Sequence, residues 1–142
     1  MKTISIISPC YNEQDNIEVC YLAVREVFER ELSDYSYQHR LVDKASTDSS
    51  MEILREIARK DPKVTVLKNA RNYGPFRSVF NALGSATGDA TLVMLPVDLQ
   101  DPPELIPKFV DAWEEGAMIV FGQRTQRQES MILRTIRQSY YK

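Results

Sequence analysis

The stretch that decides the fold spans residues 90–104 and reads ATLVMLPVDLQDPPE. It begins with an apolar run, residues 90–95, of the kind that forms a buried strand in a parallel sheet. An acidic loop follows. Asp101 can then cap a helix that has Pro102 at its first position and Glu104 at its third. A strand, a polar loop and a helix start in this order predict an α/β fold.

The same alternation extends in both directions along the chain. Further strands are predicted at residues 3–9, near 41–43, at 64–67 and at 118–121, with helical patterns between them. The sequence therefore predicts a three-layer α/β/α sandwich with a mostly parallel central sheet. We find no internal repeat, low-complexity tract or linker, so residues 1–142 are expected to form a single domain.

Capping residues and apolar periodicity predict the helices. Asn12 is expected to cap a helix whose apolar stripe spans residues 17–32, and Ser49 with Glu52 forms a capping box for the next helix. A third helix follows Gly74, and a last helix is expected over residues 128–141. The side chains expected to face the core from the third helix and from the helix after Asp101 are Phe76, Val79, Phe80, Leu83, Leu105, Ile106, Phe109, Val110 and Trp113.

Composition excludes several classes of protein. The net charge of −2 gives no basic field, so we expect no nucleic-acid partner. Cys10 and Cys20 form no CxxC motif, which favours a reduced, cytoplasmic protein without zinc. No apolar run approaches a signal-peptide core or the ~20 residues of a membrane span. The second strand looks partly exposed at His39 and Arg40, and His39, the only histidine, is interpreted as structural.

Ligands of open α/β sheets bind beyond the carboxyl ends of the strands. The loops after the first four predicted strands carry mostly acids and amides, and the loop after the fifth predicted strand carries arginines. Neither GxGxxG nor GxxxxGK[ST] is present, so the phosphates of a nucleotide would be bound by a metal ion or by arginines.

Five motifs in order carry a family resemblance: ISPCYNE at residues 7–13, VDKASTD at 42–48, RNYG at 71–74, DLQDPPE at 98–104 and GQR at 122–124. Together they resemble the inverting family-two glycosyltransferases, in the dolichol-phosphate mannosyltransferase and bactoprenol glucosyltransferase branch. The resemblance covers nearly the whole chain. It implies a GT-A fold, the fold of nucleotide-diphospho-sugar transferases.

The resemblance also assigns the nucleotide pocket. It implies that Pro9, Tyr11 and Glu13 frame the base and ribose, and that Asp43 hydrogen-bonds the base. Glu13 has the alternative of a first-turn acid favoured by the helix dipole. Lys44 stands where the family usually has an acid or asparagine, which would alter base recognition. Arg71 and Asn72 either border the pocket or form a turn before Gly74.

Asp98 matches the second acid of the family's DxD motif, which holds Mg²⁺ or Mn²⁺ against the diphosphate of a UDP- or GDP-linked sugar. Pro96 stands at the position of the first acid. Asp98 with phosphates and water either suffices as a metal site, or metal affinity is weakened. Gln100 is expected to position the diphosphate or the sugar.

Two further positions are candidates for catalysis beside Asp98. Asp101 is first a helix cap, and in its functional alternative it lies near the acceptor and orients or deprotonates it. Arg124 matches the family's arginine after the fifth strand, and Arg127 follows closely. Guanidinium groups suit phosphate binding, whereas a solvated surface pair is the alternative.

The resemblance implies transfer of a sugar to a polyprenyl or dolichyl phosphate by metal-assisted inverting displacement, at the cytoplasmic face of a membrane. A non-catalytic nucleotide-sugar-binding domain or an inactive fragment is the alternative, because Pro96 removes an acid and relatives continue well past this length. Apolar side chains at residues 132–141 favour a homo-oligomer. The base, the sugar and the acceptor stay open.

Overall fold

The computed structural model describes residues 1–93 and 95–123. The chain divides into two compact units, the first from Met1 to Asp111 and the second beginning at Ala112. That residues 1–142 form one domain stays a prediction. Within the described residues, no helix is both long enough and apolar enough to cross a bilayer.

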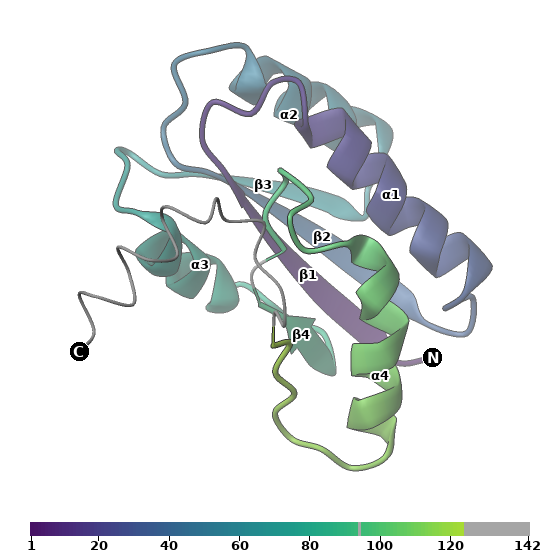
Figure 1. The fold of residues 1–142 in the computed structure, drawn as a ribbon. Coiled ribbons are helices and arrows are strands. Elements are labelled where there is room, and N and C mark those ends of the chain that lie inside the picture. The colour runs from purple at the N-terminus through teal and green to yellow at the C-terminus, as the bar shows by residue number, and fades with distance from the viewer. Residues whose placement is uncertain (94, 124–142) are drawn as a thin grey trace, which may run out of the picture. The chain divides into compact units, whose positions relative to one another are not determined.

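A parallel sheet of four strands forms the centre of the first unit (Figure 1). Its strands, in the spatial order β3-β2-β1-β4, are β1 (Thr3–Cys10), β2 (Ser36–Asp43), β3 (Val64–Lys68) and β4 (Ala90–Leu92). The helices are α1 (Ile17–Arg30), α2 (Ser50–Lys60), α3 (Pro75–Leu83) and α4 (Ile106–Glu114), with a 3₁₀ turn, η1 (Pro103–Leu105), before α4.

Helices cover both faces of this sheet. On one face Ile7 and Val42 pack against Val79 and Ala82 of α3. On the other face lie α1 and α2, where the rings of Phe28 in α1 and Tyr37 in β2 stack at 4.4 Å between centroids (Figure 1). The predicted three-layer α/β/α arrangement is confirmed.

The second strand is buried, which contradicts its predicted partial exposure. His39 is 0% and Arg40 8% exposed, because β2 is an interior strand between β1 and β3 with helices over both faces. His39 Nε2 lies 2.9 Å from Ser8 Oγ on the neighbouring strand. Burial lowers the pKa of His39 to about 4, so the ring is neutral at pH 7.

The apolar face of α3 was predicted wrongly in part. Val79 is buried, but Phe76 and Phe80 are 76% and 77% exposed, and Leu83 is exposed as well. Ser78 Oγ fixes the rotation of the helix, because it donates to Gly74 O at 2.8 Å and accepts a hydrogen bond from Asn69 Nδ2 at 2.7 Å. With Ser78 held inward, the helical period turns both phenylalanines away from the sheet.

The helix after the DLQDPPE motif begins later than predicted, and Pro102 rather than the predicted Asp101 is the N-cap residue of the 3₁₀ turn before it. Pro102 is extended, with φ −70° and ψ 133°, and the 3₁₀ turn η1 precedes α4. The cause is Pro103, because a residue before proline is pushed out of the helical region. Ile106 and Val110 face the core as predicted, whereas Leu105 is exposed.

The end of α4 agrees with the sequence, but the fifth strand does not form. Gly116, at φ 101°, donates to Trp113 O, and Ala117 donates to Ala112 O, which is a Schellman motif. Residues 118–121 were predicted as a strand. They are irregular and expose their apolar side chains, because an apolar run becomes a strand only where a partner strand satisfies its backbone. Strand β4 likewise ends at Leu92 rather than at residue 95, and the helix predicted at 128–141 lies outside the described residues.

Candidate functional site

The loops after β1 and β2 are joined by hydrogen bonds at the carboxyl edge of the sheet. Asn12 Oδ1 accepts the Thr47 N–H at 2.9 Å, and the Asn12 N–H donates to Ser46 Oγ at 3.0 Å. The Glu13 N–H donates to Ser50 Oγ at 3.0 Å. These contacts bring together two of the loops that the sequence places at the ligand edge.

Asn12 is therefore not the helix cap that was predicted. The N-cap of α1 is Asn16, and Asn12 has a positive φ of 54°. Asparagine tolerates this region because its short amide bonds locally, here to the neighbouring loop. Glu13 supports the helix start instead: its carbonyl accepts the N–H groups of Asn16 and Ile17, and its carboxylate accepts Asn16 Nδ2 at 2.7 Å.

Asp48 rather than Ser49 makes the side-chain contacts at the start of α2. Ser49 occupies the N-cap position without a side-chain capping bond, whereas Asp48 Oδ1 accepts the Ser50 N–H at 3.0 Å. Asp48 Oδ2 accepts the Gln14 N–H at 3.3 Å, which adds a further bond between the two loops. Desolvation raises the pKa of Asp48, but the bonds from Ser50 and Gln14 lower it more, so its pKa lies below the ordinary value.

Asp43 ends β2 with a carboxylate that is fully buried. Both of its oxygens accept the Ser46 N–H, at 3.1 and 3.3 Å, and its backbone carbonyl accepts the Asn69 N–H at 2.9 Å. A buried carboxylate with such bonds holds the turn of residues 43–46 in place. Its predicted bond to the base stays a prediction.

Cys10, the last residue of β1, lies within electrostatic range of four charged side chains at this edge. Burial, first, and then the nearby carboxylates of Asp43, Glu13 and Asp48 raise the pKa of its thiol to about 12, while the Lys44 ammonium lowers it. Glu13 and Asp43, two of the acids predicted for the nucleotide pocket, therefore both lie within electrostatic range of this thiol, as Asp48 does. The thiol itself is protonated and inert at neutral pH.

Tyr11 is exposed at this edge, and Lys44 beside it is partly exposed. The Tyr11 side chain is 38% exposed, and Lys44 Nζ lies 5.8 Å from the centroid of its ring. This distance is within the range of a cation–π contact. Pro9, the remaining predicted pocket residue of this loop, is buried in β1.

Asp98 lies on an exposed turn beyond β4. The Leu99 N–H donates to Pro96 O at 3.2 Å, and the Gln100 N–H donates to Asp98 Oδ1 at 3.2 Å. Val97, 1% exposed, anchors this turn in the core. Burial raises the pKa of the Cys20 thiol in α1 to about 12, the Ser8 hydrogen bond lowers it, and the Asp98 carboxylate raises it, so Asp98 lies within electrostatic range of this helix.

Metal ligands are sparse at this turn. Among residues 1–93 and 95–123, no three His, Cys, Asp or Glu side chains group as a metal site would require. Asp98 is an exposed hard-oxygen donor, which fits an ion that also takes oxygens from a diphosphate and water.

The loop after β3 forms a turn, as one alternative predicted. Asn72 Oδ1 accepts the Gly74 N–H at 2.9 Å, and Gly74 has a φ of 83° that glycine adopts without strain. The Arg71 guanidinium lies 4.8 Å from the Tyr73 ring centroid. That Arg71 borders the pocket stays a prediction, and Arg124 and Arg127 lie outside the described residues.

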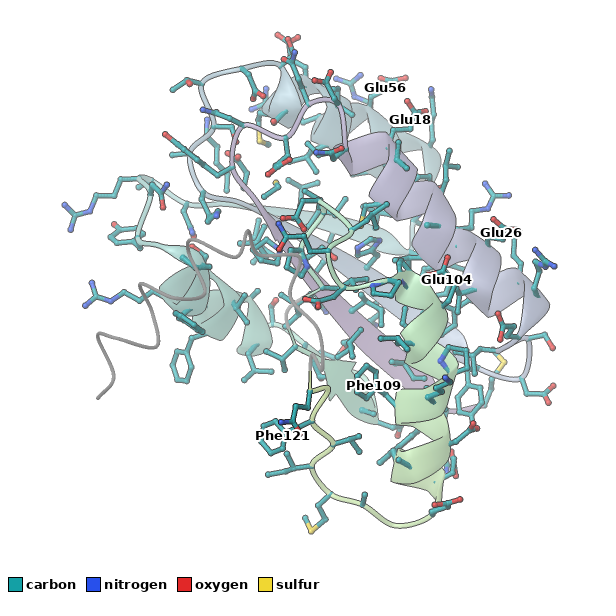
Figure 2. All side chains as sticks on the ribbon, in the orientation of Figure 1. Glu18, Glu26, Glu56, Glu104, Phe109 and Phe121 are labelled. Carbon is teal, nitrogen blue, oxygen red and sulfur yellow. The ribbon has the colours of Figure 1, made fainter. Side chains whose placement is uncertain are left out.

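A groove between α1 and α2 is lined mostly by charged side chains of these two helices. Glu18 and Glu26 on α1 and Glu56 on α2 project from the outer faces of these helices (Figure 2). Glu56 pairs there with Arg59 and Lys60 at 3.0 and 3.1 Å. Exposed ion pairs of this kind contribute little to stability. The candidate site therefore stays at the carboxyl edge of the sheet.

Sequence comparison finds relatives that are named as sugar transferases. A prophage bactoprenol glucosyl transferase homolog of Escherichia coli (strain K12) is 39% identical over 124 residues, which are 87% of this chain and 40% of that protein. An undecaprenyl-phosphate 4-deoxy-4-formamido-L-arabinose transferase of Yersinia enterocolitica is 36% identical over 137 residues, 95% of this chain and 41% of that protein. The chain thus spans about 40% of the length of these relatives.

Two solved structures share the fold. The mannosyltransferase PcManGT from Pyrobaculum calidifontis, in complex with GDP-Man and Mn²⁺, has a TM-score of 0.63 at 24% identity, over 75% of this chain and 31% of that one. S. aureus TarS 1-349 in complex with UDP has a TM-score of 0.57 at 22% identity, over 89% and 38%. The predicted GT-A architecture is confirmed. The sequence also matches the family described as Glycosyl transferase family 2 over residues 5–140, and the chain belongs to this family.

Proposed function

We propose that this chain is the nucleotide-sugar-binding part of a glycosyltransferase that moves a sugar from a nucleoside diphosphate to a polyprenyl phosphate. One observation carries the proposal: at the carboxyl edge of the sheet, Asn12 links the loop after β1 to the loop after β2 by hydrogen bonds. The exposed Tyr11 ring lies at the same edge. Membership of the family and relatives named for bactoprenol and undecaprenyl-phosphate transfer support the choice of substrates.

The reaction would be a direct displacement. An anionic oxygen of the acceptor phosphate attacks the anomeric carbon, the bond from that carbon to the diphosphate breaks, and the nucleoside diphosphate leaves with the electron pair. A phosphate acceptor is already ionised at neutral pH, so it requires no strong base. Asp101 would then orient the acceptor rather than deprotonate it, and Arg124 and Arg127 would bind phosphate oxygens.

A divalent ion, Mg²⁺ or Mn²⁺, would neutralise the charge that grows on the leaving diphosphate. Asp98 is the residue that would hold it, because its carboxylate is exposed at the carboxyl edge of the sheet. Gln100, whose backbone is tied to Asp98 Oδ1, would lie against the diphosphate. Because Pro96 stands at the position of the first acid of the DxD motif, the ion and the nucleotide would bind together.

Calorimetric titration of UDP and GDP, with and without Mn²⁺, tests the binding site. We expect nucleotide binding that strengthens with Mn²⁺, and an Asp98→Ala variant that loses the metal-dependent part by about tenfold or more, as expected for removal of a charged ligand. Asp34→Ala removes an exposed acid between α1 and β2, at the opposite edge, and is the matched control. Absence of any nucleotide binding by the wild-type chain contradicts the proposal.

Product formation separates the enzyme from a non-catalytic binding domain, the alternative that Pro96 favours. A short polyprenyl phosphate and the UDP- or GDP-sugar that binds are incubated with the chain and Mn²⁺, and the glycolipid is measured by mass spectrometry. Transfer that disappears in Asp98→Ala supports the enzyme. Tight nucleotide-sugar binding without transfer supports the binding domain.

A further inference from the structure

Lys44 is the one cationic side chain of the loop after β2, and it is partly exposed. Its neighbour Asp43 is 0% exposed, and both carboxylate oxygens already accept the Ser46 N–H. Because this carboxylate is fully buried, a ligand reaches it only if the loop moves. Lys44 is partly exposed, and its N–H donates to Cys10 O at 3.0 Å, which fixes its backbone to the end of β1.

The Lys44 ammonium lies beside an exposed aromatic ring. Its Nζ is 5.8 Å from the centroid of Tyr11, whose side chain is 38% exposed. A planar base stacks favourably on such a ring. A base lying there would have the ammonium at its rim, within reach of its exocyclic groups.

The surrounding charges favour a neutral partner for Lys44 over a phosphate. The carboxylates of Asp43, Glu13 and Asp48 and the Lys44 ammonium all act on the Cys10 thiol, so all four groups lie within electrostatic range of the end of β1. Three negative charges repel a phosphate at this position, whereas the carbonyl oxygen of a base suffers no such repulsion.

We propose that Lys44 is a specificity-determining residue that selects nucleoside diphosphates with a carbonyl at position 4 of a pyrimidine or position 6 of a purine, uracil or guanine, over those with an amino group at that position, cytosine or adenine. An ammonium has donors and no acceptor, so it pairs with a carbonyl and faces an amino group donor to donor. The proposal rests on the proposed function, since it needs a nucleotide at this edge of the sheet.

The pair UDP and CDP tests the proposal, because the two molecules share the ribose and the diphosphate and differ on the rim of the base. Calorimetry with Mg²⁺ is expected to show UDP binding about tenfold more tightly than CDP to the wild-type chain. GDP and ADP give the same comparison for purines. Lys44→Met should bring the UDP/CDP ratio to within about twofold, since it keeps the side chain's bulk and removes the donor.

Two more variants keep the result interpretable. Lys44→Arg retains donors without an acceptor and should retain the preference, whereas Lys44→Gln offers both a donor and an acceptor and should relax it. Lys63→Met is the matched control: Lys63 Nζ lies 4.6 Å from the Tyr37 ring, the same kind of contact, but just before β3, at the opposite edge. It should leave the ratio unchanged.

The outcomes separate this proposal from the proposed function. A UDP/CDP ratio that persists in Lys44→Met and Lys44→Gln, or a wild-type chain that binds the two equally, overturns the role of Lys44 and leaves the nucleotide site standing. A wild-type chain that binds none of the four nucleotides overturns the proposed function, and the role of Lys44 with it.

Discussion

Asp43 and His39 show how single polar residues are accommodated in this sheet. Asp43 is buried at the end of β2 and keeps its carboxylate bonded to the Ser46 N–H. His39 is buried four residues earlier and contacts Ser8 Oγ through Nε2, while its Nδ1 has no partner within the described residues. Burial disfavours the protonated ring more than the Asp61 carboxylate favours it, so His39 makes stability depend on pH.

We predict that stability falls between pH 7 and pH 5. Burial lowers the pKa of His39 to about 4 in the folded state, against about 6.5 when unfolded. The unfolded chain therefore binds the proton first. The contribution of His39 is complete above pH 6.5 and is lost as the pH falls towards 4, by about 2 kcal/mol between pH 7 and pH 5.

Urea unfolding of the wild type and of His39→Gln at the two pH values measures this contribution. The variant should lack this part of the pH dependence, because carboxylates titrate alike in both proteins. His39 is the only histidine, so an NMR titration of its ring in the wild type gives an independent measurement. A ring that titrates above pH 6 would contradict the account.

At the scale of elements, the sequence predicted the alternation of strands and helices, because apolar periodicity and caps act locally. The prediction failed where a residue elsewhere in the sequence determines the local conformation. Asn12 looks like a helix cap until the loop after β2 supplies Thr47, and Phe80 looks like a core residue until Ser78 and Asn69 set the rotation of α3. Residues 118–121 look like a strand, but the described chain gives them no ladder partner.

Gly88 illustrates a contact between two strands that apolar periodicity does not reveal. A Cβ atom at this position would lie 2.7 Å from Thr3 O, 2.8 Å from Ser5 N and 2.9 Å from Ala90 O, all backbone atoms of β1 and β4. The glycine therefore lets β4 approach β1. We predict that Gly88→Ala lowers the free energy of unfolding by about 1–3 kcal/mol, as for other overpacked sites.

Gly84→Ala is the matched control for this prediction. A Cβ at Gly84 would lie 3.6 Å from Asn81 O, an ordinary contact, and its φ of −62° suits alanine. This variant should change stability little, or stabilise by about 0.4–1 kcal/mol through the unfolded state. Thermal and urea unfolding measure both variants, and equal effects would show that Gly88 is not a close-approach position.

At the scale of the molecule, the parallel order β3-β2-β1-β4 brings the loops after β1, β2 and β3 to one edge of the sheet. The sequence predicted this edge correctly, because parallel strands end on the same side. It could not predict that Asp43 is buried and bonded while Lys44 and Tyr11 are exposed, since both results depend on how the two loops close on each other. The contacts between the two loops therefore determine which side chains the candidate site exposes.

The central claim is that a nucleoside diphosphate binds at this edge. Backbone amide NMR of the labelled chain, titrated with UDP and Mg²⁺, tests it most directly. We predict shifts concentrated at residues 11–14, 43–48 and 98–100, with residues 34 and 63 at the opposite edge unchanged. Shifts at the opposite edge, or an unchanged spectrum at saturating UDP and GDP, would contradict the account.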